Sequence, residues 1–174
     1  MKQQLSVNGR SEQMRILVTA SREWRNDSST REMFRRALLD EFEHVAGYVE
    51  LDEVTVAHGA QGVYDKTGVL ISGGDMISDE VAEELGMCTD PIPADWNGPC
   101  DVTCHHGPRR RRRDGSSYCQ MAGFRRNAAL IATQPVVCLG FPHPSHPSRG
   151  TRHCMSLATA AGITTYDRSN LLMA

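Results

Sequence analysis

Residues 14–24 read MRILVTASREW, an apolar run that ends abruptly in small and polar side chains. The run over 14–19 predicts a short buried strand. The polar residues at 19–24 predict a loop at the end of that strand. In open α/β sheets, ligands bind outside the carboxyl ends of the strands. This loop is therefore the first place to expect a binding site.

Strand and helix patterns alternate along the rest of the chain. Ser29 followed by Glu32 has the pattern of a capping box and predicts the start of a helix that ends near Gly47. The other predicted elements are helices over 79–85, 121–132 and 152–161, and strands over 54–57, 87–92, 136–139 and 163–166. Strands separated by helices predict βαβ units. The expected fold class is α/β, a Rossmann-like parallel sheet flanked by helices.

The length of 174 residues suits one domain. We predict a flexible tail over 1–13 and a Rossmann-like domain over 14–167, with a Cys- and Arg-rich insert at 94–120. The chain is 40% hydrophobic and 23% charged, as in ordinary soluble proteins. It has no apolar run long enough for a membrane span and no apolar segment typical of a secretory signal. We therefore expect a cytoplasmic protein with no membrane partner.

The second strand ends in a glycine-rich loop that begins at His58-Gly59-Ala60. After an interruption comes Gly73-Gly74-Asp75, just before a predicted helix. Glycines let backbone N–H groups approach an anion, and Asp75 is placed to reach a ribose hydroxyl. A histidine in such a loop is more often structural than catalytic. The interrupting segment, 63–72, has the features of a lid or an oligomer contact, and we expect a homo-oligomer.

The fourth strand is followed by Ser148-Arg149-Gly150-Thr151 and then a helix. A helix N-terminus offers free N–H groups and the positive end of the helix dipole, so it suits an anion. Gly150 permits close approach, the hydroxyls donate hydrogen bonds, and Arg149 adds charge. Simple helix capping by Ser148 or Thr151 fits the same residues. In the first loop, likewise, Arg22 could bind a phosphate, or Trp24 could merely fold onto the core.

Taken in order, these motifs resemble the YspA and cpYpsA-related branch of the SLOG superfamily. Further matching pieces are Pro93-Ala94-Asp95-Trp96, Gly123 with Arg126-Asn127, and Ala161-Gly162-Ile163, so that the match spans residues 15–166. The resemblance implies a Rossmann-like fold, a nucleotide-derived ligand such as an NAD or ADP-ribose derivative, a sensing role, and a phage or actinobacterial source. The ligand-binding residues it indicates are Thr19, Ser21, Arg22, Trp24, His58, Gly59, Ala60, Asp75, Arg126, Asn127, Ser148, Arg149, Gly150 and Thr151.

Phosphoribohydrolases of the same superfamily resemble a Pro-Gly-Gly-x-Gly-Thr-x-x-Glu pattern whose Glu is catalytic. Here Gly150-Thr151 is followed by Arg152-His153-Cys154, so that Glu is missing. The departure argues against hydrolase activity. If the protein is nevertheless a nucleotide N-glycosidase, Asp75 and Glu80 are the candidate catalytic residues.

The insert carries Cys100, Cys104 and Cys119, with His105 and His106 between them. Zinc favours four such ligands in a tetrahedron. We therefore expect a structural zinc ion on the three thiolates and one of the two histidines, with His106 as the candidate. The alternative is three unpaired thiols in a polar loop. Cys88, Cys138 and Cys154 are instead expected to be small core residues.

Five consecutive arginines occupy 109–113. Such a run is most often a solvated surface. It could also clamp an anionic ligand, or bind nucleic acid through phosphate contacts, which is the second alternative function. The leading hypothesis is a protein that binds a nucleotide-like small molecule at the strand ends.

Overall fold

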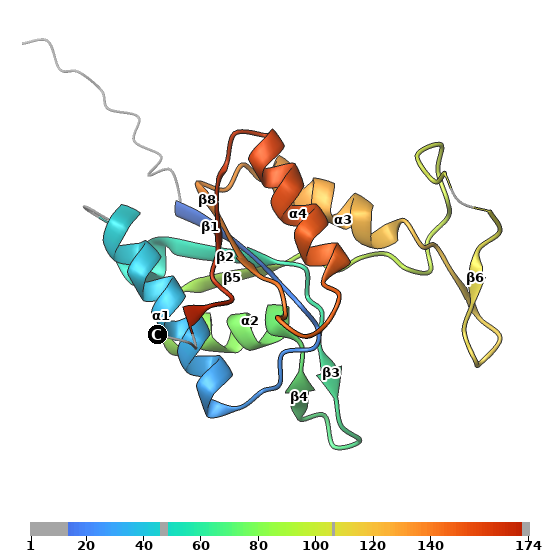
Figure 1. Ribbon diagram of the computed structural model, residues 1–174. Helices are drawn as coiled ribbons and strands as arrows, with labels where there is room; N and C mark the ends of the chain where they lie inside the picture. The colour runs from blue at the N-terminus through green and yellow to red at the C-terminus, as the bar shows by residue number, and fades with distance from the viewer. Residues whose placement is uncertain (1–13, 46–48, 106, 172–174) are drawn as a thin grey trace, which may run out of the picture.

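A computed structural model describes residues 14–45, 49–105 and 107–171. Its centre is a parallel sheet whose strands lie in the order β5-β2-β1-β8-β9. The bounds are β1 (Met14–Ala20), β2 (Val54–His58), β5 (Cys88–Pro91), β8 (Val137–Phe141) and β9 (Thr164–Asp167). Figure 1 shows helices on both faces of this sheet. The predicted α/β fold class is confirmed.

The helices pack in pairs. On one face α1 (Ser28–Val45) contacts α2 (Gly74–Glu84), and on the other α3 (Ala122–Ala132) contacts α4 (Arg149–Ala160). From β1 the chain moves outward through β2 to β5, then returns to place β8 on the other side of β1. The strand order therefore reverses between β1 and β8. Such a reversal opens a crevice at the carboxyl ends of the two strands.

Alternating side chains of β1 supply both halves of the core. Ile16 and Val18 are buried with α1 and α2, whereas Leu17 is buried on the opposite face with Cys154 of α4. This is why the strand reads as a continuous apolar run: both of its faces are covered. The result is a β1 that is fixed on two sides, next to the crevice.

Three predicted helix starts are wrong. The first helix is capped by Asp27, whose Oδ1 accepts the Thr30 N–H at 2.9 Å, and not by Ser29. Helix α2 begins at Gly74 rather than Asp79, after Gly73 has turned the chain with φ of 120°. Helix α4 begins at Arg149 rather than residue 152. The last two differences matter for function, because they place Asp75 and the residues Arg149 to Thr151 within the first turns of helices rather than in the loops before them.

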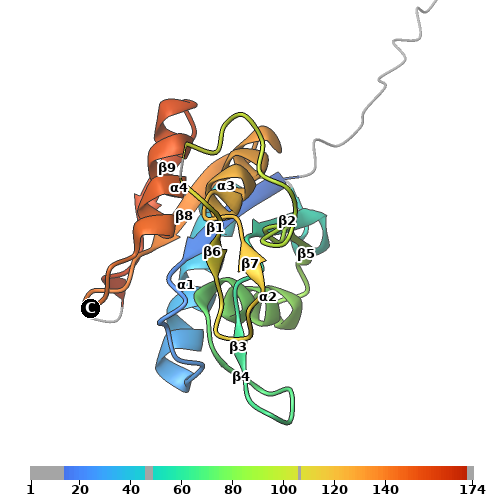
Figure 2. The same cartoon turned by 90° about the vertical axis from the view of Figure 1, so that its right-hand side faces the viewer.

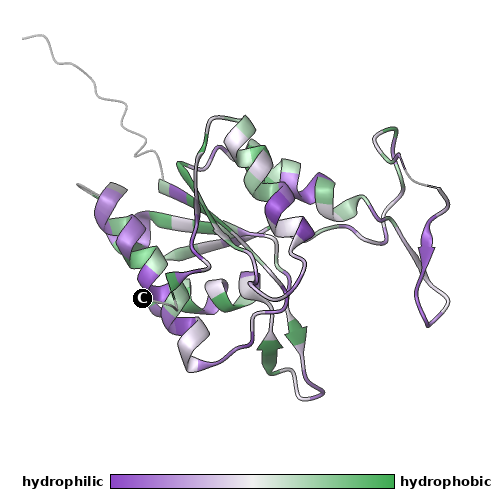
Figure 3. Ribbon diagram, in the orientation of Figure 1, coloured by the Kyte–Doolittle hydropathy of each residue, from purple (hydrophilic) through white to green (hydrophobic). Residues whose placement is uncertain are grey.

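Two hairpins occupy the segments that interrupt the pattern. The first pairs β3 (Val63–Tyr64) with β4 (Leu70–Ser72), and the second pairs β6 (Arg110–Arg111) with β7 (Ser117–Tyr118). Figure 2 views the molecule from the side on which the β6–β7 hairpin projects. In Figure 3 the β3–β4 hairpin is largely apolar in colour. The exposed apolar side chains on it and its loop are Val63, Tyr64, Val69 and Ile71.

The three cysteines outside the insert differ in burial. Cys138 and Cys154 are fully buried, as predicted, but Cys88 is exposed on the edge strand β5 and donates to the Asp52 carbonyl. The prediction for Cys88 is therefore wrong, because a strand with only one neighbour leaves one side open. None of the helices in the described ranges has the length and apolar run that a membrane crossing requires.

Candidate functional site

A cavity of about 360 Å³ lies at the crevice between β1 and β8. Its walls come from the loop after β1, the start of α2, the base of the insert, α3 and the start of α4. Most of the predicted ligand residues meet here: Thr19, Ser21, Arg22, Asp75, Arg126, Asn127, Ser148, Arg149, Gly150 and Thr151. The volume falls in the usual range for small-molecule sites, roughly 300–1,000 Å³.

Asp75 lies at the start of α2 and joins the end of β1, the loop after β2 and helix α3. Its Oδ1 accepts the Ala20 N–H at 3.0 Å and its Oδ2 the Gln61 N–H at 3.4 Å, while Arg126 Nη1 lies 3.8 Å from Oδ2. Burial raises the pKa of the Asp75 carboxyl, and the nearby Arg126 and His58 oppose that rise. These contacts use the carboxylate to anchor the loops, which leaves less of it for a ribose than the sequence suggested.

Arg126 crosses the floor of the cavity from α3. Its side chain is only 11% exposed, its Nε donates to Asn127 Oδ1 at 3.0 Å, and its Nη1 donates to the Gly59 carbonyl. A Cβ on Gly59 would collide with this guanidinium. The absence of a side chain at Gly59 therefore makes room for the Arg126 guanidinium in this position.

The start of α4 forms the opposite wall. Ser148 makes no capping hydrogen bond; its Oγ accepts the His143 N–H at 2.8 Å and so closes the preceding loop. In the described part of the chain no hydrogen bond uses the N–H groups of Arg149, Gly150 or Thr151. A Cβ on Gly150 would meet no atom within 4 Å. The first turn of α4 thus presents free donors and the positive end of its dipole to the cavity.

Two arginines stand at the mouth of the cavity. The Arg22 side chain is 74% exposed and its Nε donates to Glu23 at 3.1 Å, and Arg149 is exposed on the first turn of α4. Both guanidinium groups can turn toward an anion, since among the described residues neither has a buried hydrogen-bond partner. Together with the α4 N-terminus they favour a negatively charged ligand.

Four of the predicted ligand residues lie outside the cavity walls: Trp24, His58, Gly59 and Ala60. Trp24 is buried in the core, where its Nε1 donates to the Phe141 carbonyl at 2.8 Å. His58 is also fully buried. Its Nδ1 accepts the Ala60 N–H at 3.2 Å, which leaves Nε2 to donate to Asp79 Oδ1 at 2.7 Å.

The His58–Asp79 hydrogen bond lowers the pKa of the Asp79 carboxyl and ties β2 to α2. This arrangement places His58 in the structural role that the sequence favoured. The candidate Glu80 is also away from the cavity, where it pairs with Arg31 of α1 at 2.7 Å. Of the two candidate catalytic carboxylates, only Asp75 reaches the cavity.

Several cavity residues were missed by reasoning from the strand ends. Trp96 and Gln120 come from the two ends of the insert, and Phe124 from α3. Trp96 lay in a motif of the family resemblance, but its position in the wall depends on contacts between distant segments. No sequence signal marked Gln120 or Phe124.

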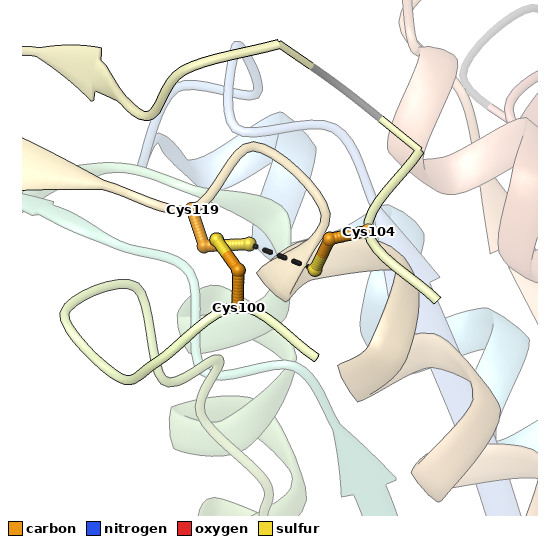
Figure 4. Close-up of side chains that lie close together, drawn as sticks. All are labelled: Cys100, Cys104 and Cys119. Carbon is orange, nitrogen blue, oxygen red and sulfur yellow. Dashed lines mark hydrogen bonds between the residues drawn. The ribbon is translucent and has the colours of Figure 1, made fainter. Parts of the chain in front are cut away.

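The three cysteines of the insert come together (Figure 4). Their sulfur atoms all lie within 4.8 Å of one another, and Cys104 Sγ is 3.4 Å from Cys119 Sγ. Tetrahedral zinc with Zn–S bonds near 2.3 Å needs sulfurs about 3.8 Å apart. The cluster therefore could bind a metal ion. His105 is exposed and is not part of this group, and His106 lies outside the described residues.

Some arginines of the run 109–113 make contacts within the insert, and the others are exposed. Arg109 donates to the carbonyls of four insert residues, at 2.6–3.4 Å, namely Trp96, Asn97, Gly98 and Ser117. Arg112 donates to Asn97 Oδ1 at 3.0 Å and stacks on Tyr118. Arg110, Arg111 and Arg113 are exposed. Two of the five arginines thus hold the insert together.

The strand order and the cavity at the strand-order reversal define a doubly wound α/β protein of Rossmann type. The chain is 32% identical over 149 residues to the Gene 61 protein of Mycobacterium phage D29, across 86% of this chain and 91% of that protein. It belongs to the family of that phage protein. Neither a protein-family model nor a solved structure matches it.

Proposed function

We propose that the protein binds a nucleotide or a nucleotide-derived molecule in the cavity, as a sensor or a sequestering protein. The observation that carries the proposal is the uncapped first turn of α4, whose N–H groups stand at the cavity wall beside Arg149. A phosphate is the ligand group that best fits such a helix terminus. Arg22, across the mouth, supplies a second positive charge.

The rest of the cavity fits the other end of a nucleotide. Trp96 and Phe124 add aromatic surface to its walls, and both are partly exposed. Flat aromatic side chains suit the stacking of a planar base. The resemblance to the YspA and cpYpsA-related branch of the SLOG superfamily supports the same ligand class, and the phage relative agrees with the setting in which that branch is expected.

The direct test is to denature freshly purified protein and identify any released small molecule by mass spectrometry. Calorimetric titration with AMP and with ADP-ribose then measures affinity. We expect at least one of these phosphate-bearing ligands to bind and adenosine, which lacks the phosphate, to bind far more weakly. Equal affinity for AMP and adenosine would contradict a phosphate seat at α4.

We expect little or no release of adenine from AMP. The superfamily's catalytic Glu is missing after Thr151, and Asp75, the buried carboxylate that reaches the cavity, is bound to two backbone N–H groups. Chromatography of AMP incubated with the protein checks this. Release of many equivalents of adenine per chain, lost in Asp75→Asn, would identify a nucleotide N-glycosidase instead.

We propose zinc as the metal of the Cys100, Cys104 and Cys119 cluster, with His105, His106 or a water as fourth ligand. Three thiolates with one nitrogen or oxygen ligand is a donor set that zinc prefers. We expect metal analysis of protein prepared without chelator to find one zinc per chain. Cys119→Ser should reduce this to about a tenth or less, and Cys88→Ser should leave it unchanged. A zinc-free wild-type protein would refute the assignment.

Nucleic acid remains the second candidate partner, because Arg110, Arg111 and Arg113 are exposed on the β6–β7 hairpin. Contacts with phosphates weaken steeply with salt, by a slope that grows with the number of contacts. Duplex binding that is steep in salt, and lost when these three residues are changed to serine, would favour this function.

A further inference from the structure

The thiol cluster and the cavity are built from the same stretch of chain. Cys119 is followed by Gln120, which lines the cavity. The N–H of Cys119 donates to the carbonyl of Trp96, another residue of the cavity wall, at 2.9 Å. The cluster cysteine that is fully buried is thus one hydrogen bond away from the aromatic wall.

Trp96 itself is held by two neighbours of the cluster. A Cβ on Gly123 of α3 would come within 3.0 Å of the indole Cη2, so the ring lies close against that helix. The ring also meets Tyr118 edge to face, with centroids 6.2 Å apart. Tyr118 directly precedes Cys119. A shift of Cys119 would therefore move both the carbonyl and the ring contact of Trp96.

A second link runs through α3. Arg125 Nη1 lies 2.7 Å from Cys104 Sγ and 3.4 Å from Cys119 Sγ, and the next residue, Arg126, crosses the cavity floor. N–H groups that donate to metal-bound ligands orient them and are a regular part of metal sites. The cluster therefore contacts α3 at the turn that carries Arg126.

Hydrophobic burial does little to hold the insert in place. None of the described residues between Asn97 and Tyr118 is buried. The hydrogen bonds of Arg109 join the segments of the insert to one another. Arg125 of α3 links the insert to the body through its contacts with Cys104 and Cys119. Many segments with little apolar surface gain a fixed structure by binding a metal ion.

We propose that a metal ion on Cys100, Cys104 and Cys119 fixes Trp96 in the cavity wall, so that metal loading sets the affinity of the cavity for its ligand. The second half of this statement rests on the proposed nucleotide binding, and the first half rests only on the proposed metal site. Coupling between two sites on one protein is commonly 5–150-fold in affinity. We expect removal of the metal to weaken AMP binding by on the order of tenfold.

The experiment uses the full chain with zinc bound, after removal of zinc with a chelator, and after zinc is restored. Amide hydrogen exchange is measured over residues 94–120 and, as an internal reference, over β1. The fluorescence of Trp96 is followed in Trp24→Phe, which leaves Trp96 as the only tryptophan. We expect faster exchange in 94–120 and a red-shifted Trp96 emission without zinc, both reversed by zinc, with β1 unchanged.

Cys119→Ser should reproduce the zinc-free state, and Cys88→Ser, an exposed thiol outside the cluster, should behave as wild type. Unchanged exchange in 94–120 after zinc removal would overturn the proposal, and so would AMP affinity that is equal with and without zinc. If exchange and emission respond to zinc but the loaded protein binds no AMP, ADP-ribose or other nucleotide, the proposed function fails while the role of the metal in placing Trp96 stands.

Discussion

Gly150→Asp is expected to abolish nucleotide binding in a protein that remains folded. The substitution meets no atom within 4 Å of its Cβ, and it adds a carboxylate to the wall where we place the phosphate. We expect like-charge repulsion and blocked N–H donors to cost about 3 kcal/mol or more, and each 1.4 kcal/mol is about tenfold in affinity. We therefore expect AMP affinity to fall by at least about a hundredfold in calorimetric titration.

The same variant should be at least as stable as the wild type. A carboxylate in the first turn of a helix gains about 0.3–1 kcal/mol from the helix dipole. Gly150→Asn is the matched control, since it has nearly the same size without the charge and should lose much less affinity. Arg22→Ala should also lose less, because that side chain is 74% exposed. Unchanged affinity in folded Gly150→Asp would place the phosphate elsewhere.

Asp75→Ala is expected to lower the free energy of unfolding by about 3 kcal/mol. It removes the acceptor of the Ala20 and Gln61 N–H groups and the negative charge nearest Arg126, in a buried position. Unsatisfied buried donors cost about 1–3 kcal/mol each, and loss of one partner of a buried ion pair costs a similar amount or more. Urea denaturation followed by circular dichroism measures the loss.

Glu80→Ala is the control for this variant, because it removes a carboxylate from the same helix. Glu80 pairs with Arg31 at 2.7 Å, and its side chain is 42% exposed. Ion pairs at such exposed positions contribute roughly 0–1 kcal/mol. A loss in Asp75→Ala no greater than that in Glu80→Ala would mean that Asp75 does not anchor the loops.

The sheet could be predicted from the sequence because each central strand is buried on both faces. A short apolar run such as 14–19, followed by polar residues, is typical of a buried strand. The glycines misled the prediction of α2. Gly73 and Gly74 usually mark a loop, but Gly74 is the first residue of the helix, and its lack of a side chain reflects close packing, because a Cβ there would collide with that of Ala20. That close approach involves two segments that are distant in the sequence, so no local sequence pattern could predict it.

The candidate site could also be predicted in part from the sequence. Residues that follow strands, such as Ser21 and Ser148, gather at the cavity because parallel strands end at one edge of the sheet. Trp24 follows β1 and His58 is the last residue of β2, yet both side chains turn inward, where their partners Phe141 and Asp79 come from other elements. The direction of a side chain in a loop depends on such partners, which only the structure reveals.

The hydrogen bond from Cys119 to Trp96 has a consequence for how the chain can change in length. It closes the insert at its base, with its two ends 2.9 Å apart at N and O. The entropy of closing a loop grows only with the logarithm of its length, about 0.6 kcal/mol for each doubling. A change in length between Asn97 and Tyr118 that keeps Arg109 and the thiol cluster should therefore cost the sheet little free energy.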